Sequence, residues 1–189
     1  MSVQWEILRD TLSKEVTKGQ SLYAILDSAR EIDIAYWLLE SKDVEYVSLY
    51  KGRKEEPIWD AAPYLVSCPS DSQIFRWILA KGWGHSWGVF LTSTANLETL
   101  CAHLQQFLLV KTEDDKEFHF RFYDPRVLRV FSTTCTADEI RQFFGPVTRF
   151  LMESEQPNHL VRQTVSVQGL RQEEISLAAA AQSNTSPNP

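Results

Sequence analysis

The sequence predicts a mixed α/β fold, in which helices cover both faces of a sheet to give mostly three layers, with a small C-terminal appendage. Two observations favour this fold. Short apolar runs typical of strands alternate along the chain with segments whose apolar residues recur at helical spacing. The 189 residues are 43% hydrophobic, which is enough for one core without disulfides or metals. Antiparallel hairpins late in the chain leave the order of the strands open.

The first half of the chain is predicted to alternate helices and strands. Helices are indicated where apolar residues recur every three or four positions, and strands where short apolar runs stand between polar segments. In order, these are a helix at 5–16, a strand at 22–26, a helix at 32–40, and strands at 46–50 and 63–68. Ser70 or Asp71 then caps a further helix, which ends near Gly82 because glycine is common just past helix ends.

The second half continues this alternation and then changes character. It is predicted to hold a strand at 87–91, a helix at 97–109, a strand at 118–123, helices beginning at Asp124 and at a Thr136–Glu139 capping box, and a strand at 148–152. These elements complete an α/β domain over 1–153. Residues 154–181 are predicted to form a C-terminal extension, with a helix over 170–181. Residues 182–189 have nothing to bury, so we expect a disordered tail.

The charge balance limits the partners. Lys and Arg number 19 against 25 Asp and Glu, a net charge of −6, so the overall field attracts neither nucleic acid nor an anionic membrane. The N-terminus lacks the apolar segment of a secretion signal, and no apolar run approaches the ~18 residues of a membrane span. The sequence therefore predicts a cytoplasmic protein that binds neither nucleic acid nor membrane.

The chain shows no pattern for a cofactor or a metal. Cys68, Cys101 and Cys135 are widely spaced and lie in or beside apolar segments, which indicates buried reduced thiols. The four histidines are scattered, and no second ligand pair completes a zinc site. No glycine-rich phosphate-binding loop is present. We therefore expect no cofactor and no metal.

A change of period marks residues 118–128. Phenylalanines alternate with polar residues up to Tyr123, as in a strand with one buried face, and helical spacing begins at Asp124. Asp124 is a preferred N-cap, and Pro125 suits the first helical position. The polar residues gathered at this strand end are Arg121, Tyr123, Asp124 and Arg126. Ligands and partners often bind at strand ends in α/β sheets, although a capped helix with a local Asp–Arg pair accounts for the same residues without a function.

Two aspartates each follow a predicted strand. In a parallel sheet, Asp27 and Asp124 could face one crevice as paired carboxylates for a metal or for acid–base chemistry. The alternative is that each caps the helix that follows it. We favour the caps, because N-caps are common and each contributes ~1 kcal/mol without any function.

Residues 84–88, GHSWG, match the nucleophile elbow of serine hydrolases, with Ser86 as the nucleophile. An elbow needs a strand before the serine and a helix after it. Here a helix ending near Gly82 precedes the motif and a strand follows it, so the context is reversed. Asp124 and His159 could be nominated to complete a triad, although His159 lies in the C-terminal extension. A serine hydrolase using Ser86 is therefore kept as the alternative function.

Several short blocks occur in a fixed order. They are YAILD at 23–27, APYLV at 62–66, GWG at 82–84 before WGVF at 87–90, FRFYDPRVL at 120–128 and FGP at 144–146. Together they resemble the type VI secretion effector-chaperone or adaptor domain family, long catalogued as a domain of unknown function. The resemblance covers residues 22–150, and FRFYDPR is its most specific part. Ser28 stands where the family commonly has another small residue, often glycine.

The resemblance implies a non-catalytic cytoplasmic protein of a Gram-negative bacterium, which holds a cognate toxic effector and helps to load it onto the VgrG spike. Aromatic and arginine anchors suit such an adaptor. The residues expected to form its binding face, or the scaffold beneath that face, are Asp27, Tyr64, Arg121, Tyr123, Asp124 and Arg126. The arginines would donate forked hydrogen bonds, the tyrosines would provide rigid contact area, and the aspartates would cap loops. The extension at 154–181 is not matched by the resemblance, and it is where cargo specificity could reside. A structural subunit without cargo is a third possibility.

Overall fold

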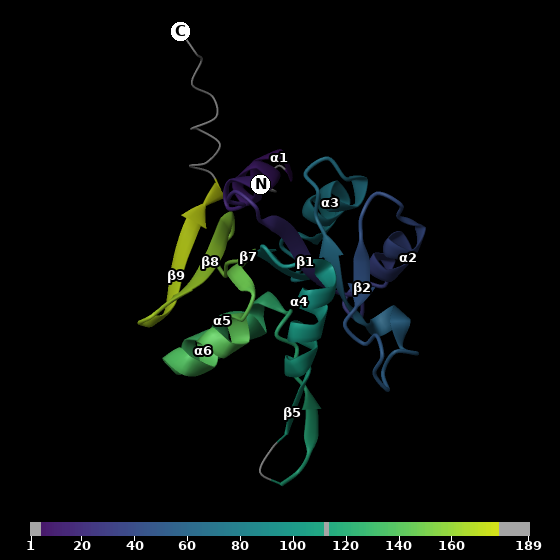
Figure 1. The fold of residues 1–189 in the computed structure, drawn as a ribbon. Helices are drawn as coiled ribbons and strands as arrows, with labels where there is room; N and C mark the ends of the chain where they lie inside the picture. The colour runs from purple at the N-terminus through teal and green to yellow at the C-terminus, as the bar shows by residue number, and fades with distance from the viewer. Residues whose placement is uncertain (1–4, 112–113, 178–189) are drawn as a thin grey trace.

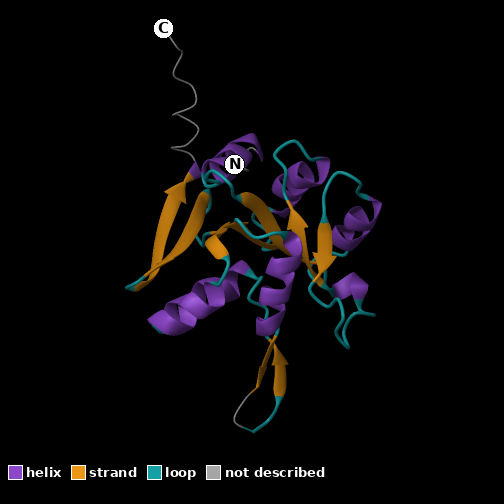
Figure 2. Ribbon diagram, in the orientation of Figure 1, coloured by secondary structure: helices purple, strands orange, loops and turns teal. Residues whose placement is uncertain are grey.

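The structure is a computed structural model that describes residues 5–111 and 114–177. Its centre is a seven-stranded sheet in the order β2-β3-β1-β4-β7-β8-β9, in which every neighbouring pair is antiparallel (Figures 1 and 2). The strands are β1 (Ser21–Asp27), β2 (Tyr46–Ser48), β3 (Pro63–Ser67), β4 (Gly88–Ser93), β7 (Val147–Glu153), β8 (His159–Ser166) and β9 (Gly169–Ser176). A separate hairpin pairs β5 (Leu109–Lys111) with β6 (Glu117–His119).

Six α-helices and three short helical turns surround the sheet in the described part of the chain. The helices are α1 (Trp5–Lys14), α2 (Asp33–Glu40), α3 (Gln73–Trp77), α4 (Leu97–Leu104), α5 (Pro125–Thr134) and α6 (Ala137–Phe144). The turns are η1 (Trp59–Ala61), the π-helical η2 (Ile78–Gly82) and η3 (Gln105–Phe107). The mixed α/β fold predicted from the sequence is confirmed. No helix in residues 5–111 or 114–177 combines the length and apolar character needed to cross a membrane.

The helices lie on both faces of the sheet, which gives three layers. Phe90 on β4 meets Phe75 of α3, with ring centroids 6.1 Å apart. Phe150 on β7 pairs with Leu91, the next residue along β4, and successive side chains of a strand point to opposite faces. On that opposite face, the Phe150 ring stacks on Phe143 of α6 at 5.4 Å. In Figure 1, α1, α2 and α3 accordingly group apart from α4, α5 and α6.

The predicted helix over 170–181 is wrong. Residues 169–176 form strand β9, and β8 and β9 continue the main sheet beyond β7, at the left of Figure 1. Arg, Gln and Glu favour helices locally, but pairing with β8 overrides that preference. Arg162 on β8 forms ion pairs with Glu173 across the strands and with Glu15 after α1. Residues 178–181, like the predicted tail, lie outside the described residues.

The predicted strand over 118–123 is shorter than expected, and it belongs to a separate hairpin and not to the main sheet. Only residues 117–119 are extended, and they pair with β5 in a hairpin that projects from the body below α4 (Figure 1). Phe118 is 52% exposed, whereas Phe122 is fully buried. The alternating pattern therefore predicted the burial of Phe122 correctly and that of Phe118 wrongly, and it cannot show which sheet a strand joins.

The predicted helix boundaries are mostly correct. Asp124 is the N-cap of α5, and Thr136 with Glu139 forms the predicted capping box of α6. The cap of α3 is Ser72, whose hydroxyl accepts a hydrogen bond from the backbone N–H of Phe75 at 3.0 Å, in place of Ser70 or Asp71. The helix expected over 97–109 ends as an α-helix at 104.

All three cysteines are free. Cys68 and Cys101 are buried, as predicted, whereas Cys135 is only partly buried.

Candidate functional site

Five of the six predicted site residues come together where β1 ends and α5 begins. They are Asp27, Arg121, Tyr123, Asp124 and Arg126, and we call this set the Asp27 corner. Asp27 is the last residue of β1, and the Nη2 atom of Arg121 lies 3.6 Å from its Oδ2. Asp124 begins α5 and lies near enough to Asp27 to raise the pKa of Asp27. The sequence offered a meeting of the two aspartates only as the alternative to helix caps, in a parallel sheet. In the structure, Asp27 ends a strand of an antiparallel sheet, whereas Asp124 lies outside the sheet as the N-cap of α5.

Asp27 is a buried carboxylate with incomplete hydrogen bonding. Its side chain is 1% exposed, Oδ1 accepts a hydrogen bond from the backbone N–H of Ala29 at 3.2 Å, and Oδ2 has no hydrogen-bond partner. Burial raises the pKa of Asp27, and the charge of Arg121 offsets this rise only in part. The prediction that Asp27 caps the following helix is wrong, since α2 begins after Ile32 without a side-chain cap. Asp27 instead closes the turn that follows β1.

Asp124 is fully engaged with Arg126. Its Oδ1 accepts from the backbone N–H of Arg126 at 2.9 Å and from Nε at 3.0 Å, while Oδ2 accepts from Nη2 at 2.5 Å. Burial alone would raise the pKa of Asp124, but these hydrogen bonds outweigh burial and lower it. The forked contact holds the guanidinium in one orientation.

The cations of the Asp27 corner face solvent while the anions do not. The side chains of Arg121 and Arg126 are 48% and 54% exposed, against 1% for Asp27 and 6% for Asp124. A wholly buried ion-pair network therefore does not describe the site. The buried carboxylates anchor two arginine side chains that present donors at the surface.

The two predicted tyrosines do not provide surface contact area, contrary to the prediction. Tyr123 is 2% and Tyr64 5% exposed. Burial raises the pKa of Tyr123, and the nearby charges of Asp27 and Tyr50 raise it further. Tyr64 lies on β3, where its hydroxyl donates to the Trp59 carbonyl at 2.8 Å. Both residues support the site from beneath.

Sequence reasoning missed three residues around the Asp27 corner. Tyr50 is buried beside Tyr123 and Asp27, Arg30 donates from Nε to the His85 carbonyl at 3.2 Å, and Glu153 reaches the site from the end of β7. Arg30 follows Asp27 by three residues, and this spacing is only a weak indication in the sequence that Arg30 lies at the site. No local pattern indicates Glu153, because strand pairing over more than sixty residues brings it here.

The GHSWG segment has the order of elements that the sequence predicts. The turn η2 precedes it and strand β4 follows it. Ser86 adopts a left-handed φ of 55°, and its backbone N–H lies 3.2 Å from both carboxylate oxygens of Glu153. Its hydroxyl has no hydrogen bond to a described histidine, and His159 instead bonds through Nδ1 to Pro157. Gly88 permits close pairing with β1, since a Cβ there would lie 2.0 Å from the Ile25 carbonyl oxygen.

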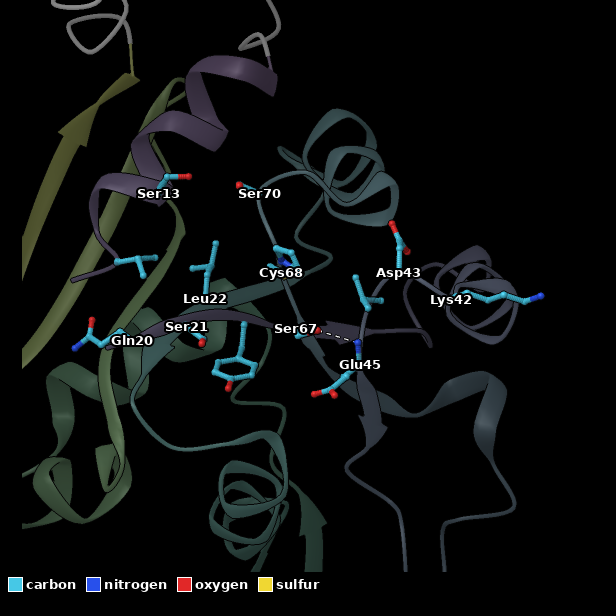
Figure 3. A pocket seen from close by; sticks show the side chains of 14 residues that line it. Ser13, Gln20, Ser21, Leu22, Lys42, Asp43, Glu45, Ser67, Cys68 and Ser70 are labelled. Atoms are coloured by element: carbon cyan, nitrogen blue, oxygen red, sulfur yellow. Dashed lines mark hydrogen bonds between the residues drawn. The ribbon is translucent and has the colours of Figure 1, made fainter. Parts of the chain in front are cut away.

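A cavity lies at the opposite end of β1 from the Asp27 corner. It has a volume of 760 Å³ and is lined by serine hydroxyls and by the loop that contains Asp43 and Glu45 (Figure 3). Ser67 accepts a hydrogen bond from the Glu45 N–H at 2.9 Å. The cavity also reaches Cys68. Burial strongly raises the pKa of the Cys68 thiol, which therefore stays protonated at neutral pH. None of the predicted site residues lines the cavity.

In the described part of the chain, no three His, Cys, Asp or Glu side chains are grouped closely enough to hold a metal ion. The two aspartates of the Asp27 corner are each matched to an arginine. Their arrangement suits recognition of carboxylates and backbone carbonyls by exposed guanidinium groups.

The pKa shifts predict opposite pH dependence for two matched variants. The pKa of Asp27 is raised above its ordinary value near 3.8, so its charge destabilises the folded state increasingly as pH rises through the raised pKa. Relative to wild type, Asp27→Asn should therefore become more stable with increasing pH. The pKa of Asp124 is lowered, so Asp124→Asn should instead lose relative stability as pH rises through that lower range. Urea unfolding from pH 3 to 7 measures both slopes, and a falling relative stability of Asp27→Asn would contradict the assignment.

Comparison with known proteins gives one match. A profile of the family described as Domain of unknown function (DUF4123) matches residues 22–142, nearly two thirds of the chain. No curated protein and no solved structure matches the sequence. The matched region contains the whole Asp27 corner, β2 to β4 and all of β1 except its first residue, whereas β7, β8 and β9 follow it. The protein belongs to the DUF4123 family.

Proposed function

We propose that this protein is a non-catalytic chaperone and adaptor that binds a cognate type VI secretion effector in the cytoplasm and helps to load it onto the VgrG spike. The resemblance of the FRFYDPRVL block and its companions supports this functional class. The Asp27 corner is the observation on this chain that carries the proposal. Its residues belong to the matched part of the chain, and its arginines are placed to contact a polypeptide.

The energetic argument concerns preorganisation. Binding a long flexible side chain usually costs ~0.5–1.5 kcal/mol of rotamer freedom at an interface. Arg126 has already lost much of this freedom, because Asp124 holds its Nε and Nη2 atoms in a forked contact. Arg121 is less constrained, because its Nη2 lies 3.6 Å from the Asp27 Oδ2 in an ion pair without a hydrogen bond. Anchored arginines are typical of interface hot spots, so this surface supports capture of a protein partner.

Co-expression with the toxin encoded nearest to its gene is the direct test. Wild-type protein should co-purify with that toxin and should raise its soluble yield. Addition of the VgrG encoded alongside should then give a complex of all three proteins. A toxin that stays soluble by itself and never co-elutes with this chain would overturn the proposal.

The alternative function is a serine hydrolase that uses Ser86. The GHSWG motif favours it, and the left-handed backbone at Ser86 is a feature shared with strained nucleophile turns. The order of elements around Ser86 is the reverse of a nucleophile elbow, and its hydroxyl makes no hydrogen bond to a described histidine, so both observations count against the hydrolase.

The variant Ser86→Ala separates the two functions. We expect effector capture and thermal stability to remain at wild-type levels, because the Ser86 contact with Glu153 uses the backbone N–H, which alanine keeps. An esterase assay with p-nitrophenyl acyl esters should show equal background rates for both proteins. Turnover by wild type that the variant lacks would establish the hydrolase.

A further inference from the structure

An exposed apolar surface, separate from the Asp27 corner, covers α2 and the start of η1. In the described part of the chain, ten large apolar side chains are exposed, and six of them lie here. These six are Ile32, Tyr36, Trp37, Leu39, Ile58 and Trp59, and we call this surface the α2 face. The segments touch through Tyr36 and Trp59, whose rings meet edge to face at 5.6 Å. Clustering of this kind marks interaction surfaces more often than scattered apolar residues do.

Helix α2 is apolar on both sides. Ile34, Ala35 and Leu38 are fully buried against the body, as a surface helix requires. Its outward side is also apolar, because Ile32, Tyr36 and Leu39 recur at helical spacing and are 46%, 51% and 56% exposed. Residues 34–39 of α2, between the terminal carboxylates Asp33 and Glu40, are thus apolar all round, and such a helix segment is normally covered on all sides. The outward side of α2 therefore fits a helix that is covered when the protein performs its function.

A stack of indoles fixes the position of the α2 face. Trp37 stacks on Trp77 with centroids 5.4 Å apart, and Trp77 lies 4.9 Å from the nearly buried Trp87. Gly82 lies against the Trp87 ring, since a Cβ at Gly82 would come within 2.7 Å of it. A partner therefore meets a rigid aromatic surface, which needs little ordering on binding.

The charge around the α2 face is acidic. Residues 31–43 contain four carboxylates and one lysine. Two hollows of about 390 and 400 Å³ flank the indole stack, and each has indole, two carboxylates and one lysine in its lining. Glu31 and Asp33 line the first, which also reaches His85, and Glu40 and Asp43 line the second. A partner's Lys or Arg placed in either hollow would meet both an indole and net negative charge.

We propose that the α2 face docks an amphipathic helix of the partner protein, with an apolar stripe against Tyr36 and Leu39 and with Lys or Arg side chains in the flanking hollows. This inference rests on the proposed function in taking the partner to be a polypeptide cargo. The acidic surroundings decide between occupants. A second copy of this chain would bring the same carboxylates together, and an anionic membrane would be repelled by a chain of net charge −6.

Synthetic peptides of about 14 residues, or about four helical turns, test the charge and the periodicity separately. The first peptide carries leucines at helical spacing with lysines between them. The second is a scrambled peptide of the same composition, and the third replaces every lysine with glutamate. Isothermal titration calorimetry with the whole protein should show binding of the first peptide only. Equal binding of the scrambled peptide, or binding of the glutamate peptide, would overturn the inference.

Variants locate the binding on the protein. Tyr36→Ser with Leu39→Ser should weaken the leucine–lysine peptide at least tenfold. The matched control is Val110→Ser with Val167→Ser, which removes two exposed apolar side chains elsewhere and should change nothing. For charge, Asp33→Asn with Glu40→Gln should weaken binding and reduce its salt dependence. Glu6→Gln with Glu98→Gln removes two exposed carboxylates on other helices and should not.

Capture of the effector by the same variants separates this inference from the proposed function. A wild type that captures its effector, beside a folded Tyr36→Ser/Leu39→Ser variant that captures it equally well, would overturn the α2 face and leave the adaptor function intact. Failure of the wild type to capture any effector would overturn the adaptor function. The peptide titrations would then still decide whether the α2 face binds a basic helix. Reduced capture by the variant, with an unchanged melting temperature, would support both.

Discussion

Arg126→Ala should weaken effector capture by ~2 kcal/mol or more, about 30-fold in Kd, while the protein stays folded. The variant removes a half-exposed guanidinium, and Asp124 keeps its hydrogen bond from the backbone N–H of residue 126. The N-cap of α5 therefore survives, although Asp124 loses two side-chain hydrogen bonds and the protein loses some stability with them. Effector titration, read beside the melting temperature, measures both quantities.

Arg121 needs a different design, because its loss leaves the buried Asp27 carboxylate without its cation. The single variant Arg121→Ala should lose stability, and the double variant with Asp27→Asn should recover it. If Arg121 contacts cargo, the recovered double variant still captures the effector weakly. Arg171→Ala, which removes an exposed ion-paired arginine from β9, is the matched control and should capture normally. Full-strength capture by folded Arg126→Ala would show that the Asp27 corner is not the binding face.

Phe143→Ala should destabilise the protein by ~3–5 kcal/mol, the usual cost of emptying the site of a buried phenylalanine. Phe143 is 1% exposed, and its ring contacts five other phenylalanines. These are Phe107, Phe122, Phe131, Phe144 and Phe150. Since Phe122 is the residue before Tyr123, this cluster also supports the Asp27 corner from below.

Phe118→Ala is the control for Phe143→Ala, because it makes the same chemical change at a side chain that is 52% exposed on the projecting hairpin. It should cost less than ~1 kcal/mol, since little apolar surface is uncovered. Urea denaturation measures both variants. A loss at Phe143 no larger than that at Phe118 would show that the phenylalanine cluster is loosely packed.

Local patterns predicted the elements of this fold better than their arrangement. Helix caps such as Asp124 and Thr136 depend on a few adjacent residues, and the sequence placed them correctly. Strand partners depend on contacts between distant residues, which a pattern of period two does not contain. The sequence therefore did not reveal that residues 169–176 pair with β8, or that the 118–123 run turns away from the main sheet.

The candidate site shows the same division. Arg121, Tyr123, Asp124 and Arg126 lie within six residues, so one segment indicated them together. Asp27 joined them through the resemblance and through its place at a strand end. The sequence did not show which of these side chains are buried, because Tyr123 lies in a turn after the strand, where the alternation of buried and exposed residues no longer applies. Only the three-dimensional structure places Tyr123 beneath the surface and the arginines above it.

The sheet also has a practical consequence for expressing parts of this family. The family match ends at residue 142, inside α6, yet β4 pairs with β7 five residues further on. A fragment cut at the limits of the match would leave the apolar β4 with an open hydrogen-bonding edge and would remove Phe150 from the phenylalanine cluster. Open apolar edges recruit strands from other molecules, so such a fragment should form insoluble aggregates. The folding unit is therefore longer than the segment by which the family is recognised.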